Sequence, residues 1–138
     1  MAASDSKRWS VRALSHGIEP PALFCRGQPV AEIAGAGAAL QPVEYLLAAV
    51  ASCFALSCRA ALAARRLRRI GYEVIVAAEK APEPPSRLKE IAVSVSFSDG
   101  VPEEDAAALV KEAEALCTIT NTLLACPNIV VTGRSSIV

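Results

Sequence analysis

One long apolar stretch constrains the fold of this chain more than any other feature. Residues 42–69 are rich in leucine, alanine and arginine, which favour a helix. Pro42 suits the first helical position, four arginines close the stretch, and Gly71 is expected to end the helix. Such a helix is about 40 Å long at 1.5 Å per residue. Because its first half is apolar on every face, we expect it at the centre of the structure.

The other expected elements are short. Strands are predicted where apolar residues alternate, and helices where they recur at helical spacing. The expected strands are 9–14, 23–33 (a hairpin turning at 27–29), 72–78, 91–97 and 128–132, and the expected helices are 102–116 and 117–124. This order indicates an α+β fold with antiparallel sheets. Since one sheet cannot cover all sides of a long apolar helix, we expect a homodimer.

Length and charge narrow the function classes. A chain of 138 residues is expected to form one domain, with strands over 1–41, the helix over 42–69 and the remaining elements over 70–138. Its 14 basic and 14 acidic residues give no electrostatic case for nucleic acid or an anionic membrane. The uncharged stretch between Glu44 and Arg59 is shorter than the roughly 20 residues of a membrane span.

The first residues carry no apolar signal segment, so a cytoplasmic protein is expected. Its five cysteines should then be mostly reduced thiols. Metal-ligand spacing and a glycine-rich phosphate loop are both missing from the sequence, so neither a metal nor an organic cofactor is expected. His16 is the only histidine, which leaves little material for a Cys-His or Ser-His-Asp triad. The arginines near the helix end are most simply a charged terminus, with binding of a phosphate or an acidic partner as the alternative.

Two cysteines are candidates for chemistry. Cys53 lies in the middle of the long helix, and by itself it is most simply a small buried apolar residue. Cys117 lies where one helix ends and another begins, and a helix N-terminus stabilises a thiolate. Packing and reactivity are equal alternatives for Cys117. Cys58 lies about 140° around the helix from Cys53, so those two thiols are not expected to meet, and Cys25 and Cys126 are expected to be structural, as is usual for free cysteines.

Two segments together resemble the OsmC/Ohr family, and more closely its less characterised OsmC-like branch. The first is the glycine-containing approach at 35–37 followed by the helix from Pro42 to Cys53. The second is the amphipathic helix that ends at Cys117 and is followed by a short helix. The order of elements agrees over nearly the whole chain, which makes the combination more specific than either segment alone.

The resemblance implies an intertwined homodimer in which antiparallel sheets wrap two long central helices. It implies a thiol-dependent peroxidase that reduces organic hydroperoxides. Cys53 would attack the peroxide and become a sulfenic acid, and Cys117 would close a disulfide with it. A dithiol donor would then reduce that disulfide, without a metal or a bound cofactor. An apolar pocket at the dimer interface would admit an alkyl chain.

The chain also departs from the family pattern. Val43 stands where the characterised peroxidases carry glutamate, and Thr118 replaces the usual proline after the second cysteine. The adjacent Glu44, as in the less characterised branch, is the candidate catalytic carboxylate, and it could reach Cys53 only from the other subunit or through a frayed first helical turn. By the same resemblance, Arg12 would hold the thiolate, with Arg26 as the second choice. These departures leave an alternative function, a non-catalytic OsmC-like dimer that binds a small molecule or senses redox state.

Overall fold

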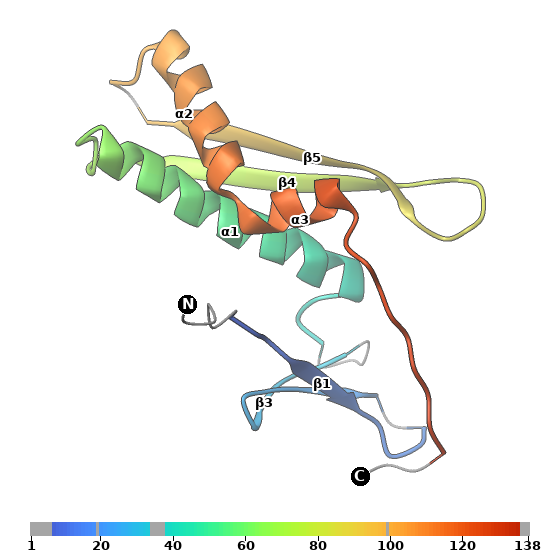
Figure 1. The fold of residues 1–138 in the computed structure, drawn as a ribbon. Coiled ribbons are helices and arrows are strands. Elements are labelled where there is room, and N and C mark those ends of the chain that lie inside the picture. Colours follow the sequence, from blue (N-terminus) through green and yellow to red (C-terminus); the bar gives the residue numbers. More distant parts are fainter. Residues whose placement is uncertain (1–6, 19, 34–37, 99, 136–138) are drawn as a thin grey trace, which may run out of the picture. The chain divides into compact units, whose positions relative to one another are not determined.

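The computed structural model describes residues 7–18, 20–33, 38–98 and 100–135 of the chain. They form two compact units, residues 1–46 and residues 47–138, and the helix α1 runs from the first into the second. The elements in chain order are β1 (Val11–Leu14), β2 (Ala22–Cys25), β3 (Gln28–Glu32), α1 (Pro42–Ala64), β4 (Tyr72–Lys80), β5 (Leu88–Phe97), α2 (Glu103–Leu116) and α3 (Thr118–Ala125) (Figure 1). This is the α+β fold with antiparallel sheets that the sequence predicted.

The first unit contains an antiparallel sheet in the order β1-β2-β3. A two-residue turn joins β2 to β3, because Cys25 pairs directly with Gln28. Its central residues, Arg26 and Gly27, have φ angles of 49° and 75°, and two positive φ angles indicate a type I′ turn. The predicted hairpin is therefore confirmed, with its turn one residue earlier than expected.

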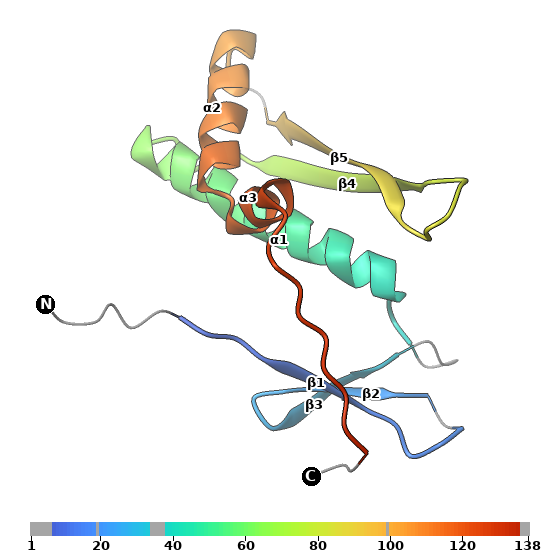
Figure 2. The ribbon, with the colours of Figure 1, turned by 45° about the vertical axis from the view of Figure 1, so that its right-hand side comes forward.

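The second unit is built on the antiparallel hairpin of β4 and β5. Apolar residues alternate along both strands, so that one face carries most of the less exposed side chains. α1 and α2 pack on that face (Figures 1 and 2). There, Phe54 and Ala113 are buried against Val74 and Val93. The hairpin thus fixes the position of α1 relative to α2 and to the residues that follow α2.

A second apolar cluster lies between α1 and α2, near the C-terminal end of α1. Ala61 and Leu62 of α1 are buried against Leu109 of α2, which is fully inaccessible to solvent. Outside this cluster, Arg65 forms an ion pair with Glu112 over 2.6 Å. Since this pair is partly exposed, burial of apolar surface contributes more than the ion pair to the packing of the helices.

The helix α1 ends five residues earlier than the sequence predicted, and Gly71 does not terminate it. Arg66 adopts a left-handed φ of 60°. The Leu67 N–H donates to the Leu62 carbonyl over 2.9 Å, and the Arg66 N–H donates to the Ala63 carbonyl over 3.0 Å. These are the two bonds of a Schellman motif, and the packing of Leu67 against Leu62 completes it. Tertiary packing therefore holds an arginine in a conformation that favours glycine.

We expect the Arg66→Gly variant to be more stable than the wild type by about 0.5–1 kcal/mol. Glycine adopts a positive φ without the steric cost that arginine bears there, although it also loses more freedom on folding. Arg69 lacks a positive φ, so Arg69→Gly is a matched control that removes the same charge. Urea denaturation should give a higher midpoint for Arg66→Gly only, and a lower one would contradict this account of the helix end.

One of the predicted strands is not formed. The segment 128–132 is not a strand, because its backbone finds no pairing strand among the described residues, and Ile129, Val130 and Val131 are exposed.

The helix α1, at 23 residues, is long and apolar enough to cross a membrane by composition. The core helix of a soluble protein meets the same criterion, and α1 supplies Val50, Phe54 and Leu62 to the buried layer.

Candidate thiol site

Three thiols come together in the second unit. Cys58 of α1 and Cys117 between α2 and α3 belong to one buried apolar cluster, with exposed fractions of 1% and 0%. Cys53, also on α1, is half-buried and packs against the same cluster. The sequence singled out Cys53 and Cys117, and the structure brings these two together. It adds Cys58, which helix geometry alone had separated from Cys53.

Backbone contacts hold Cys117 between the two helices. Its N–H donates to the Glu114 carbonyl over 3.3 Å, and its φ and ψ of −76° and 104° end α2. Its carbonyl accepts the Asn121 N–H over 3.0 Å, which begins α3, and the Thr120 Oγ1 lies 3.2 Å from the same carbonyl oxygen. The residue is therefore the C-cap of one helix and the N-cap of the next, and its side chain points into the cluster.

The environment of Cys117 favours its thiolate. Burial opposes the charged form, but hydrogen bonds to the sulfur from the Thr120 hydroxyl, the Thr120 N–H, the Cys53 thiol and the Ile119 N–H outweigh it and lower the pKa of Cys117. Two of those donors are free N–H groups of the first turn of α3, where the helix dipole also favours negative charge. The sequence-based expectation for a thiol at a helix N-terminus is thus met by these contacts.

The environment of Cys58 shifts its pKa in the opposite direction. Burial raises the pKa of Cys58, and the charge of the neighbouring Cys117 raises it further. The site therefore holds one thiol whose pKa is raised beside another whose pKa is lowered.

We expect Thr120→Val to raise the pKa of Cys117, because valine keeps the side-chain shape and removes the hydroxyl donor. A lowered pKa in the folded state adds stability that is lost as pH falls through that pKa, so the variant should lose stability only above it. Thiolate absorbance at 240 nm, followed against pH, should show the step at higher pH. Thr122→Val is the matched control, since the Thr122 hydroxyl donates to the Thr118 carbonyl instead. An unchanged step would contradict the role of Thr120.

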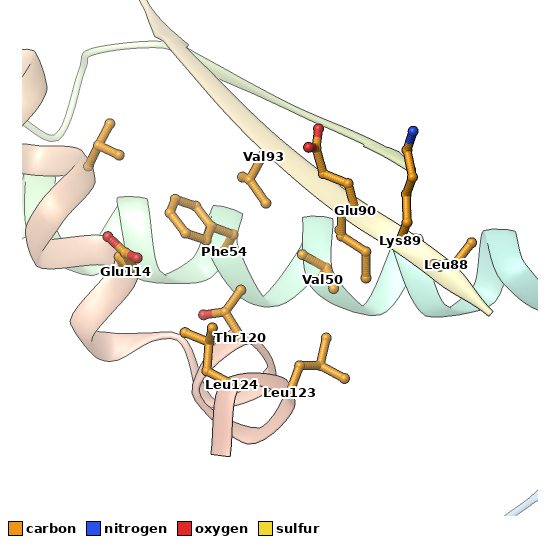
Figure 3. A pocket seen from close by; sticks show the side chains of 12 residues that line it. Val50, Phe54, Leu88, Lys89, Glu90, Val93, Glu114, Thr120, Leu123 and Leu124 are labelled. Carbon is orange, nitrogen blue, oxygen red and sulfur yellow. The ribbon is translucent and has the colours of Figure 1, made fainter. Parts of the chain in front are cut away.

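A cavity of about 610 Å³ is lined by residues of α1, β5, α2 and α3 (Figure 3). Val50 and Phe54 of α1, Val93 of β5 and Leu124 of α3 give it an apolar lining. Phe54 also belongs to the thiol cluster, and Thr120, which contacts Cys117, lines the cavity as well. The cavity is thus one side chain away from the thiols, and its apolar walls suit a hydrocarbon group.

Arg12 and Glu44, the other two predicted site residues, belong to the first unit. The Arg12 guanidinium lies over the ring of Phe24, 5.6 Å from its centre. A Glu44 carboxylate oxygen accepts the Gln41 N–H over 2.9 Å, as in the return bond of a capping box. Their roles at the thiols, and that of Arg26, stay predictions.

The two remaining cysteines lie outside the cluster. The Cys25 thiol lies 4.0 Å from the Ser10 carbonyl in the first unit, and Cys126 ends α3 with a left-handed φ of 48°. The structural role expected for both cysteines stays a prediction. Within the described part of the chain, no group of three or more histidine, cysteine or acidic side chains is arranged to hold a metal.

The chain matches a known protein family. The family described as OsmC-like protein matches residues 35–132 of this chain. A search among curated proteins found no match.

Several solved structures have the same fold. An OsmC-like protein from Mycoplasma pneumoniae is 15% identical, with a TM-score of 0.71 over 87% of this chain and 89% of that one. An organic hydroperoxide resistance protein OsmC from Legionella pneumophila is 20% identical, with a TM-score of 0.63 over 85% and 89%. The organic hydroperoxide resistance protein OhrB of Bacillus subtilis is 17% identical, with a TM-score of 0.66 over 84% and 90%.

Proposed function

The chain belongs to the OsmC-like protein family, and we propose that it is a thiol-dependent peroxidase that reduces organic hydroperoxides. The observation that carries this proposal is that the thiols of Cys53 and Cys117, which come from different elements, interact within one packed cluster. Two thiols in contact can close a disulfide after one of them is oxidised. The names of the Legionella and Bacillus proteins, both called organic hydroperoxide resistance proteins, support the choice of substrate class.

Exposure assigns the two roles. Cys53 is half-buried and can meet a substrate, whereas Cys117 is fully buried. Cys53 is therefore the peroxidatic residue and Cys117 the resolving residue.

In the first step the Cys53 thiolate attacks the distal peroxide oxygen, and the O–O bond breaks. The leaving alkoxide takes up a proton and departs as an alcohol, while Cys53 becomes a sulfenic acid. In the second step the Cys117 sulfur attacks the Cys53 sulfur, and hydroxide leaves and is protonated to water. The product is a Cys53–Cys117 disulfide, so the two electrons of the peroxide reduction come from the two thiols.

A dithiol donor then regenerates the site by thiol–disulfide exchange. The rate of exchange rises as the pKa of the leaving thiol falls, and the pKa of Cys117 is lowered. Attack at Cys53, with Cys117 as the leaving thiolate, is therefore the favoured direction. It is also the accessible one, because Cys117 has no exposed surface.

The cavity beside the thiols is the proposed binding site for the alkyl group. Its apolar walls can accept a hydrocarbon chain. Its charged lining residues are Glu90, Glu114 and Lys89, and this excess of one negative charge disfavours an anionic tail (Figure 3). We therefore propose neutral, apolar hydroperoxides as substrates. Reaction at sulfur needs neither a metal nor an organic cofactor.

The assembly and compartment are also part of the proposal. Leu56, Leu116 and Leu124 expose more than half of their surface in the single chain. A homodimer would cover such apolar surface and is proposed for this reason. A reducing compartment, the cytoplasm, would supply the dithiol and keep the thiols reduced. Arg12 and Glu44 are proposed to support the Cys53 thiolate and the substrate in that dimer.

Mass spectrometry after one equivalent of an organic hydroperoxide tests the proposal. We expect a Cys53–Cys117 disulfide and one equivalent of alcohol per chain. Chymotryptic cleavage after Phe54 separates Cys53 from Cys58, so the linked residue can be identified. Recovery of intact peroxide together with free thiols would count against the peroxidase. The alternative, a non-catalytic binding or redox-sensing dimer, predicts a ligand in the cavity without alcohol formation.

A further inference from the structure

The peroxidase cycle uses two of the three clustered thiols and leaves Cys58 without a role. The simplest account of a buried cysteine is packing, since a free thiol behaves as a small apolar residue. However, Cys58 is buried against another thiol, Cys117, and is close enough to feel its charge. Cys117 also contacts Cys53. Cys117 therefore has two potential disulfide partners on the same helix, Cys53 and Cys58.

We propose that Cys58 is a second disulfide partner of Cys117, so that the oxidised site exchanges between a Cys53–Cys117 and a Cys58–Cys117 disulfide. The inference rests on the proposed function for the source of the first disulfide. In the exchange, the Cys58 thiolate attacks the Cys117 sulfur and a new S–S bond forms. The Cys53–Cys117 bond breaks, and Cys53 leaves as a thiolate that takes up the proton lost by Cys58. No further oxidant or reductant is consumed.

The exchange has two consequences. It returns Cys53 to its reduced state while the disulfide moves to residues with exposed fractions of 1% and 0%. A second peroxide molecule can then oxidise Cys53 before any donor has acted. The exchange should be slower than closure of the first disulfide, because burial keeps Cys58 neutral and only a thiolate attacks.

The test uses the full chain with Cys25→Ser and Cys126→Ser, which leaves only the three clustered thiols. Cys53→Ser in this background leaves Cys58 and Cys117 alone. Diamide, which oxidises two neighbouring thiols without a peroxide, is added to the folded protein, and the products are alkylated and digested with trypsin. Residues 27–59 and 112–134 are then separate peptides with one cysteine each. We expect them as a disulfide-linked pair from the same chain.

The matched control adds Cys58→Ala, which should abolish the linked pair and leave Cys117 alkylated. Circular dichroism before oxidation establishes that each variant is folded. Recovery of Cys58 and Cys117 as separate alkylated peptides from a folded Cys53→Ser protein would overturn the proposal. If the Cys53→Ser variant does not fold, the background protein with Cys53 intact is oxidised and digested with chymotrypsin. A Cys58–Cys117 pair is again expected, and a Cys53–Cys117 pair alone would overturn the proposal.

The diamide result does not depend on peroxide chemistry. A linked pair with diamide but no alcohol from hydroperoxide would contradict the peroxidase and still support Cys58 as a disulfide partner of Cys117. Peroxide turnover with no Cys58–Cys117 pair would support the peroxidase proposal and contradict the disulfide exchange. In the active background protein, a time course after one equivalent of hydroperoxide should show the Cys53–Cys117 pair first and the Cys58–Cys117 pair later.

Discussion

Replacement of Cys53 by serine is expected to lower the rate of organic hydroperoxide reduction by about a thousandfold or more, because the nucleophile is removed. Serine keeps the size of the side chain, and Cys53 is only half-buried, so the fold should be retained. The measurement is alcohol formation from a neutral hydroperoxide in the presence of a dithiol donor. Circular dichroism should show the same helix content in both proteins.

Cys25→Ser is the matched control for this experiment. It removes a thiol from the first unit, outside the cluster, and should leave the rate unchanged. If Cys53→Ser retained the wild-type rate, Cys53 would have no part in the reaction. If neither the wild type nor the variants formed alcohol, the binding or redox-sensing alternative would replace the peroxidase.

Replacement of Cys117 by serine should separate the two halves of the cycle. The first oxidation of Cys53 needs no disulfide partner, so about one equivalent of alcohol per chain should still form. Steady-state turnover should then fall by about a hundredfold or more, because the sulfenic acid has lost its resolving thiol. Excess peroxide should carry Cys53 to the sulfinic acid, which mass spectrometry detects as two added oxygen atoms.

Cys126→Ser serves as the control, since it removes an exposed thiol at the end of α3 and should leave turnover unchanged. A Cys117→Ser protein with wild-type turnover would show that another group resolves the sulfenic acid. Cys58 is the candidate for that group, and a Cys53–Cys58 disulfide in this variant would identify it. Loss of the initial alcohol burst would instead indicate that Cys117 is needed to activate Cys53.

The elements of the fold were predictable because local patterns specify them. Alternating apolar residues gave β4 and β5, and the spacing of α2 and α3 gave two helices separated at Cys117. The expectation that a helix N-terminus would stabilise a thiolate at Cys117 also rested on local backbone geometry. The strand expected at 128–132 was wrong for this chain, because a strand needs a partner and β-propensity alone cannot supply one.

The sequence by itself determined which segments are helices and strands, and which cysteine begins a helix, since these depend on residues close together along the chain. Only the tertiary structure decided where α1 ends and which residues surround Cys117. Arg66 takes its left-handed φ because Leu67 packs on Leu62, and no local preference of arginine predicts it. Cys58 joins the site because α2 packs across α1, and contacts between side chains from distant segments depend on that packing.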